Sequence, residues 1–448
     1  RRNTRSGPQS RGLGDVYKRQ KLGTLSTLSI GIGGMVGGGI FAVTGLTVEV
    51  TRGAAPIAFA IAGVVALLTS YSYLKLTLRY QGECGTVAFL NQEFGAGILT
   101  GAENILLLIS YVVLLSVYAY AFGSYGASFF PKNDYEYWLH GLISTVIVGL
   151  LVVNVFGTQL VIRSENLFNV TKMLILSAFV ILGFASPVEW SRLTPDNYVP
   201  PMELIAGAML IFLNYEGFEL VANASNQIAD PKRSLPIAYV GGVLFVMLLY
   251  VLIVTVTVGH MSFAAIETTR DYALSVAAEK FSGRAGYVAI AIAALLATSS
   301  AINATFFSTG RLAYVIAKSG ELPAQLERTL RGQHLEGTLL TAALALLIAN
   351  AVPLEAIATM GSAGFLLIFM AVNLANVKLA RETDSRAWVS ALAAASTAFA
   401  LCVLCLQVGE QASTRSQIAI LASMVAVSLV IEVAYRKLTG RQIRVIKE

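Results

Sequence analysis

Nine residues of this chain, from Gly31 to Gly39, contain six glycines, and they lie inside an apolar segment long enough to cross a lipid bilayer. A glycine in a helix interior costs up to about 1 kcal/mol relative to alanine. The run therefore predicts a break in the helix, at a depth where lipid offers no partner to the freed backbone groups. Such backbone is tolerated only where it is buried in protein or lines a cavity, and pairs of broken helices hold the substrate in secondary transporters.

The composition is typical of a polytopic helical membrane protein. Of the 448 residues, 56% are hydrophobic and only 13% are charged, which is too apolar for one soluble domain of this length. Residues 1–20 differ from the rest, because they are rich in Arg, Ser and Gly, lack an initiator Met and show no apolar periodicity. We expect a basic arm there that is disordered or not native to the protein.

Apolar stretches of about 20 residues match the thickness of a bilayer, and charged residues, Pro and Gly separate them. The sequence predicts twelve spans, of which the ninth is short and the third is long. They lie near residues 23–48, 56–78, 98–130, 138–156, 166–186, 202–225, 236–259, 285–309, 338–352, 356–379, 388–408 and 417–435.

The distribution of basic residues predicts the orientation, since cytoplasmic loops are enriched in Lys and Arg. With both termini in the cytoplasm, 24 of the 32 Lys and Arg residues fall on the cytoplasmic side and seven on the outer side, and Lys172 lies inside the fifth span. The chain has no phosphate-binding loop of the Gly-x-x-x-x-Gly-Lys-Ser/Thr type. We therefore expect a protein of the cytoplasmic membrane that is driven by an ion gradient and not by ATP.

A second interruption lies half a chain away, in the sixth predicted span. The run Asn214-Tyr215-Glu216-Gly217 brings polar residues and a glycine into the middle of an apolar helix. Its position predicts two repeats of five spans, at residues 21–187 and 188–380, followed by two further helices and a tail at 381–448. Sequence identity between the two halves is not evident, so this division depends on position and hydropathy.

Several motifs in order along the chain resemble the amino acid-polyamine-organocation superfamily of amino acid permeases. They are Met35-Val36-Gly37-Gly38-Gly39-Ile40-Phe41 in the first span, Asn214-Tyr215-Glu216-Gly217-Phe218 with Asp230-Pro231-Lys232-Arg233-Ser234-Leu235-Pro236, and Arg311-Leu312-Ala313-Tyr314 with Gly320-Glu321-Leu322-Pro323. The resemblance covers the chain from about Lys21 to its C-terminus. It implies the leucine-transporter-type fold, in which helices one to five and six to ten are inverted repeats around a central site.

Broken helices can bind both charged groups of an amino acid. Backbone N–H groups at the start of the outer half of the first helix, around residues 38–40, can receive a carboxylate. Free carbonyls around residues 32–33 and from 212 to 215 can accept from an ammonium group. Close packing of helices is the alternative reason for glycine, but packing needs glycine on one face and this run has it on every face. The expected substrate-binding residues are Ile32, Gly33, Gly37, Gly38, Gly39, Ile40, Phe212, Asn214, Tyr215, Glu216 and, more weakly, Tyr111.

Lys172 is expected to couple transport to an ion gradient. An ammonium group buried without a partner costs about 3 kcal/mol, so a lysine at this depth is suited to exchanging its proton. The alternative is a side chain that reaches back to the cytoplasmic surface. The family resemblance implies that a lysine here takes the place of the sodium ion of sodium-coupled relatives.

Hydroxyl groups of Thr298, Ser299 and Ser300 in the eighth span are the expected partners of this coupling site. They could ligate sodium, but a lysine and a sodium ion would repel each other there. We therefore expect a proton as the coupling ion, with sodium second, and no other cofactor and no metal site.

Two carboxyl groups, Glu216 and Glu219, stand three residues apart in the second interruption. A carboxyl beside the site could select cationic substrates, carry a proton or bind freed backbone, and the sequence leaves these roles open. Glu103 and Asn104 are weaker candidates for lining the pathway.

Secondary active transport of amino acids by alternating access is the function that these features favour. The alternatives are a sodium-coupled symporter, an amino acid or polyamine exchanger, and a nutrient sensor of the same fold that does not transport. No catalytic motif such as His-Glu-x-x-His is present, so an enzyme is not expected. The expected partners are a small amino acid and the lipid bilayer, with no nucleic acid, and a monomer is plausible.

Overall fold

The computed structural model describes residues 21–82, 85–95, 97–156, 158–328, 334–410 and 415–439, and the predicted arm at residues 1–20 lies outside them. Within the described ranges every regular element is a helix, which confirms the all-α prediction. The α-helices are α1 Thr24–Met35, α2 Gly39–Thr51, α3 Ala55–Arg79, α4 Gly85–Phe94, α5 Ile98–Ala127, α6 Tyr135–Phe156, α7 Thr158–Ala185, α8 Pro201–Phe212, α9 Leu220–Asn223, α10 Pro231–Pro236, α11 Gly242–His260, α12 Phe263–Thr269, α13 Ala273–Ser319, α14 Leu335–Ala351, α15 Leu354–Lys378, α16 Ala387–Glu410 and α17 Arg415–Thr439. Shorter pieces include the 3₁₀ helix η5 Leu213–Glu219 and the π-helical turn η7 Ile237–Gly241.

Ten helices of the described part are long and apolar enough to cross a membrane, and the bent pair α1 and α2 makes an eleventh. The ninth predicted span corresponds to α14, which is apolar but has only 17 residues. A polytopic membrane protein is therefore confirmed. The count of twelve spans, the inverted repeat and its boundaries stay predictions.

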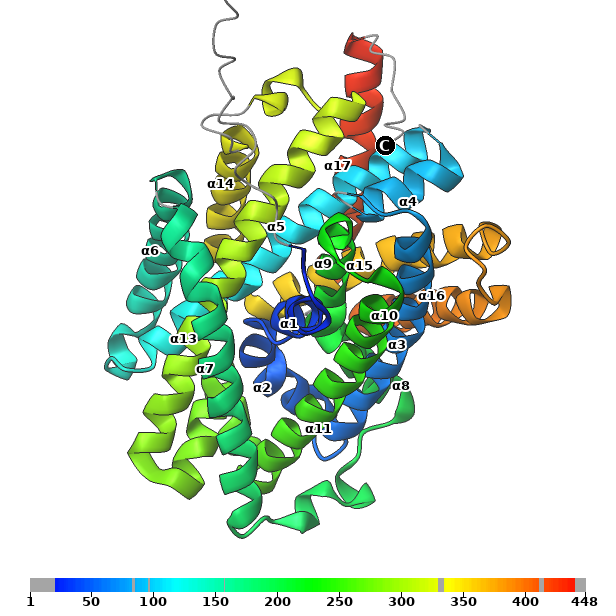
Figure 1. Cartoon of the computed structure of the whole chain (residues 1–448). Coiled ribbons are helices and arrows are strands. Elements are labelled where there is room, and N and C mark those ends of the chain that lie inside the picture. Colours follow the sequence, from blue (N-terminus) through cyan, green and yellow to red (C-terminus); the bar gives the residue numbers. More distant parts are fainter. Residues whose placement is uncertain are drawn as a thin grey trace, which may run out of the picture.

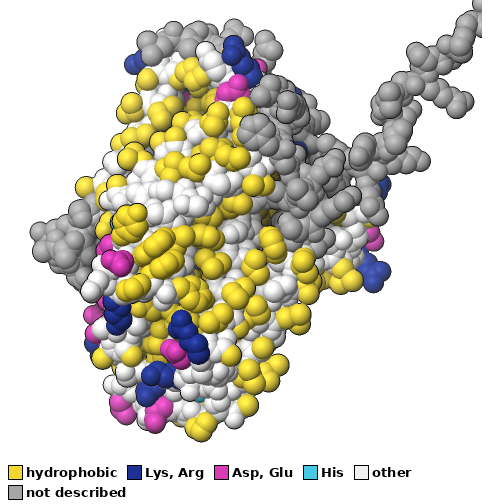
Figure 2. Space-filling model, turned by 90° about the vertical axis from the view of Figure 1, so that its left-hand side faces the viewer, with side chains coloured by type: hydrophobic (Ala, Val, Ile, Leu, Met, Phe, Trp, Pro, Cys, Tyr) yellow, Lys and Arg dark blue, Asp and Glu magenta, His cyan; other side chains and the backbone are white. Residues whose placement is uncertain are grey.

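The helices form a bundle with the broken first span near its middle (Figure 1). Most of α5 and α15 is buried, whereas α6, α7 and α17 turn most of their apolar residues outward. Hydrophobic side chains cover much of the face in Figure 2, and most of the charged side chains visible there lie toward its lower end. This is the surface that a lipid-embedded bundle requires, because lipid cannot solvate charge.

The first span breaks where the glycine run predicts. The axes of α1 and α2 differ by 44° across residues 36–38. The hydrogen-bonding groups at the end of α1 find partners on other helices, since the Tyr250 hydroxyl donates to the Met35 carbonyl oxygen at 2.6 Å. The break is thus a defined turn that tertiary contacts hold.

The second interruption is a change of helix type within one span, Pro201–Asn223. Residues Leu213–Glu219 continue from α8 as a 3₁₀ helix, and the span then ends in α9. Ser362 of α15 stabilises the transition, because its hydroxyl accepts from the Leu213 N–H at 3.3 Å and donates to the Leu210 carbonyl at 3.1 Å. The second interruption is therefore a 3₁₀ segment within the span, and not the broken helix with unwound backbone that the sequence predicts.

Aromatic packing holds η5 in place. The Phe218 ring lies edge-on to Tyr73 of α3 at a centroid distance of 5.3 Å, and Phe369 of α15 lies at 5.4 Å from the same tyrosine. Such pairs contribute about 0.5–1.5 kcal/mol each beyond the area that they bury. The second interruption is therefore anchored between α3 and α15 on one side and faces α1 on the other.

Candidate functional site

A cavity of about 400 Å³ lies between α1, α5, α7, η5 and α13. This volume falls within the usual range of small-molecule sites. Four predicted site residues line the cavity: Gly33, Tyr111, Glu216 and Ser300. The other lining residues are Leu22, Leu25, Ser26, Ser29, Ile30, Gly34, Leu114, Tyr118, Asn169, Leu220, Ala301, Ala304, Thr305 and Ser308. Leu25 is 78% exposed, so the cavity lies toward the surface where α1 begins.

Lys172 lies behind the wall of this cavity. Its side chain is 1% exposed, and its ammonium nitrogen donates to the Gly33 carbonyl oxygen at 3.2 Å. Gly33 belongs to the last turn of α1, where carbonyl groups lose their partners within the helix. Lys172 thus holds the end of α1 and does not extend to the surface.

The predicted free carbonyls at the end of α1 need one correction. The Ile32 carbonyl accepts from the Val36 N–H at 2.7 Å, so it remains part of the helix. The sequence could not show this, because the last residue of the helix depends on where the chain turns away.

Several glycines of the run are required for close packing. A Cβ on Gly34 would come within 2.8 Å of the Gly217 carbonyl oxygen, so the two broken spans meet backbone to backbone. A Cβ on Gly38 would meet Thr298 and Tyr118, each at 2.7 Å. Packing therefore explains these positions, and a binding role is an additional proposal.

Gly39 lies against the amide of Asn214. A Cβ at this position would collide with Asn214 Oδ1. The Asn214 side chain is 3% exposed, and neither its Oδ1 nor its Nδ2 has a hydrogen-bond partner in the described structure. The first N–H groups of α2, at Gly39 and Ile40, also lack partners within the helix. Donors and an acceptor therefore converge at the break, although Gly38, Gly39, Ile40 and Asn214 are not among the residues that line the cavity.

Other predicted residues lie in the protein core. The Tyr215 hydroxyl donates to the Phe59 carbonyl at 2.9 Å, and the Phe212 ring packs on Phe369 at 5.8 Å. The Thr298 hydroxyl donates to carbonyls of its own helix, at Ala294 and Leu295. These residues are not among those that line the cavity, as is also true of Ile32, Gly37 and Ser299.

The two carboxyl groups of η5 have different surroundings. Glu216 is 2% exposed and lines the cavity, and its Oε2 has no hydrogen-bond partner among the described residues. Glu219 is 1% exposed, and its Oε1 accepts from the Thr86 hydroxyl at 2.5 Å. Only Glu216 is therefore placed to meet a ligand in the large cavity.

Sequence reasoning missed Asn169 and Tyr118. Asn169 lines the cavity one turn before Lys172 on α7. Its side chain packs against Gly33, where an added Cβ would lie 3.2 Å from the Asn169 amide nitrogen. Tyr118 lines the cavity seven residues after Tyr111, hence on the same face of α5. Spacing from a predicted site residue was the signal that could have found both.

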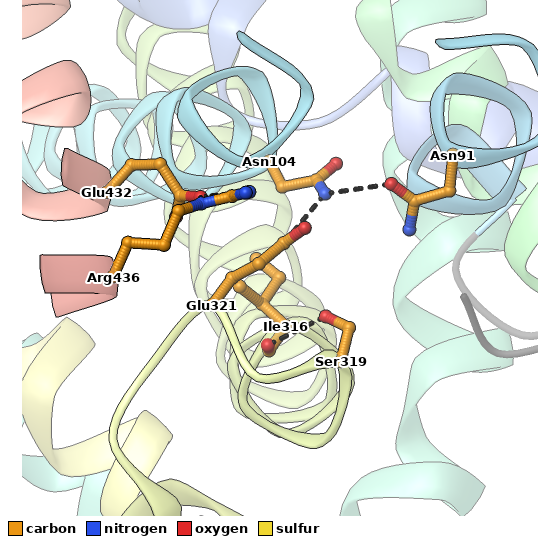
Figure 3. Close-up of polar contacts among 7 residues, drawn as sticks. All are labelled: Asn91, Asn104, Ile316, Ser319, Glu321, Glu432 and Arg436. Atoms are coloured by element: carbon orange, nitrogen blue, oxygen red, sulfur yellow. Dashed lines mark hydrogen bonds and ion pairs between the residues drawn. The ribbon is translucent and has the colours of Figure 1, made fainter. Parts of the chain in front are cut away.

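The weaker candidate Asn104 lies in a separate polar cluster (Figure 3). Its Nδ2 donates to Glu321 Oε2 at 2.8 Å, and Asn91 Oδ1 lies at 3.5 Å. Beside it, Arg436 pairs with the buried Glu432 of α17 at 2.6 Å. Glu321 lies in the loop after α13, so this cluster joins three segments distant in sequence. Neither Asn104 nor Glu103 lines the cavity.

Comparison with known proteins gives the family. The model of a family described as amino acid permease matches residues 22–430, which is nearly the whole chain. The chain belongs to the amino acid permease family. An uncharacterized protein of Methanocaldococcus jannaschii is 32% identical over 95% of this permease and 97% of its own length. The inner membrane transport protein YbaT of Escherichia coli is 31% identical, over 81% and 84%. A methylthioribose transporter of Bacillus subtilis is 25% identical, over 83% and 87%.

The family assignment agrees with the resemblance noted in the sequence and with a multi-pass membrane protein that transports a small molecule. The roles of single residues in this permease, its coupling ion and its orientation are matters for proposal.

Proposed function

We propose that this permease is a proton-coupled secondary transporter of amino acids in the cytoplasmic membrane, with both termini in the cytoplasm. One observation carries the proposal. A buried lysine inside the fifth span donates to the Gly33 carbonyl of the broken first helix, at the edge of the cavity.

The coupling step follows from this contact. A protonated Lys172 holds the end of α1 through a charge-assisted hydrogen bond, which is stronger than a neutral one. Loss of the proton weakens this bond and allows the inner half of the first helix to move, which changes access to the cavity. A second cation beside this ammonium would be repelled, so a sodium ion does not fit the same place.

Recognition of the amino acid would take place at the helix break. The N–H groups at the start of α2 and the positive end of that helix would bind the carboxylate. The Asn214 amide, which lies against Gly39, would satisfy its own orphan groups on the same ligand. The name of the Bacillus subtilis relative shows that substrates within such a set can differ. Methylthioribose therefore belongs in the first ligand screen beside the twenty amino acids.

Purified protein in liposomes tests the coupling. Uptake of a substrate found in a thermal-shift screen should rise with an inwardly directed proton gradient and not respond to a sodium gradient. Lys172→Ala should lose the response to the proton gradient while exchange of internal for external substrate continues. Lys378→Ala serves as the matched control, since this lysine is 60% exposed and pairs with Glu93 at 3.4 Å. An unchanged proton response in Lys172→Ala would overturn the coupling role, and a response to sodium would favour the sodium symporter.

A further inference from the structure

We infer that Glu216 makes this permease prefer substrates with a second cationic group, such as basic amino acids, over neutral ones of the same shape. The inference deepens the proposed function and rests on it. The sequence left the role of this carboxyl open between substrate choice, proton binding and backbone bonding.

The position of the Glu216 side chain supports the first role. It lies on η5 in the wall of the 400 Å³ cavity, and its neighbour Gly217 contacts the end of α1. Its Oε2 is buried without a hydrogen-bond partner among the described residues. A role in capping unwound backbone is therefore not supported, because η5 is helical and Glu216 Oε2 makes no hydrogen bond to the described residues.

The charge balance of the cavity supports the same role. Among the described residues that line it there is no Lys, Arg or His, and Glu216 is the only acid. Glu219 lies three residues further along η5, but it does not line this cavity and its Oε1 accepts from the Thr86 hydroxyl. A buried anion without a compensating group is costly. A cation on the ligand would offset that cost, and a neutral side chain of equal length would not.

The rest of the lining fits the methylene chain of such a ligand. Leu114, Leu220, Ala301 and Ala304 provide apolar surface between the polar groups. Ser300 and Thr305 on α13 offer further hydroxyl groups to an ammonium. The cavity thus combines an apolar wall with one anionic contact, which is the chemistry that recognises an amine at the end of a flexible chain.

Lysine and norleucine separate the effect of charge from the effect of shape, because norleucine has the same carbon chain without the terminal amine. Binding of each to purified wild-type protein, measured by calorimetry, should favour lysine by about tenfold or more, the effect expected of a hydrogen bond to a charged group. In Glu216→Gln the ratio of the two dissociation constants should fall to about one. Glu267→Gln removes an exposed carboxyl and should keep the wild-type ratio.

Equal affinity for the two ligands in the wild type would overturn the inference, and it is the result expected if Glu216 carries a proton at the working pH. A lysine preference that survives in Glu216→Gln would overturn it as well. The wild-type comparison decides the matter even if the variant does not fold. Binding of norleucine without a lysine preference would leave the proposed function standing. Binding of no amino acid at all would contradict the proposed function itself.

Discussion

The buried carboxyl of Glu321 makes the stability of the protein depend on pH in a predictable direction. The residue lies outside the membrane-spanning helices and is 1% exposed. Burial is the main cause that raises the pKa of Glu321 from 4.5 to about 7, and the nearby Glu432 also raises it. The hydrogen bond from Asn104 and the charge of Arg436 lower this pKa in part.

The sign follows from proton linkage. Between pH 4.5 and 7 the folded protein binds the proton that the unfolded chain releases, so the free energy of unfolding falls as pH rises through this window. Each pH unit between the unfolded pKa of 4.5 and the folded pKa of about 7 corresponds to about 1.4 kcal/mol of unfolding free energy. Above pH 7 the protein has therefore lost roughly 3 kcal/mol of stability through this group. Below the unfolded pKa the full stability is present.

Glu321→Gln should remove this dependence. The amide is neutral at every pH and its oxygen can still accept from Asn104. The variant should match the wild type near pH 5 and exceed it at pH 8 by up to about 3 kcal/mol. SDS titration in mild detergent, followed by tryptophan fluorescence, gives the apparent free energy of unfolding of both proteins at each pH.

The difference between the two proteins isolates Glu321 from the other carboxyls. Glu267→Gln, at an exposed site, should differ from the wild type by less than about 0.5 kcal/mol at every pH. A difference between Glu321→Gln and the wild type that does not grow from pH 5 to pH 8 would refute the reasoning. A variant that is less stable than the wild type at pH 8 would refute it equally.

Two further substitutions test the helix break and the charged pair of α17. Gly39→Ala should weaken amino acid binding, measured by calorimetry, at least about tenfold and destabilise the fold by about 1–3 kcal/mol, because its Cβ collides with Asn214 Oδ1. The control is Gly141→Ala, which has no atom within 4 Å of the new Cβ and should bind the amino acid normally in the same assay. Arg436→Ala should cost about 3–5 kcal/mol by leaving the buried Glu432 unpaired, and adding Glu432→Gln should recover much of that loss in SDS titration. Equal stability of the single and double variants would contradict the second prediction.

The sequence predicted the helical spans well because each span is a local property. A run of apolar residues of bilayer length forms a helix wherever the surrounding chain lies. The amphipathic helix α4 at Gly85–Phe94 was not predicted, since ten residues of mixed polarity have no such signature. The start of α7 at Thr158 lies before the predicted span, because a helix can continue through polar residues beyond its apolar part.

A charged residue in an apolar segment was the clearest signal for a single site residue. Lys172 and Glu216 are charged groups in apolar segments, and both lie at the cavity or its wall. Tyr215 and Thr298 carried no such contrast, and their hydroxyls bond to backbone in the core. Asn169 was overlooked although it stands one turn from Lys172.

The sequence by itself determined that the first span must break, because a run of glycines at membrane depth cannot sustain a helix at low cost. Only the tertiary structure decided what each glycine does. Gly34 meets the backbone of Gly217, and Gly39 meets the Asn214 amide, across about half the chain. Such approaches depend on how distant helices pack, and a local pattern holds no information on that distance. The break is a property of the sequence, and the groups that face each other across it are a property of the fold.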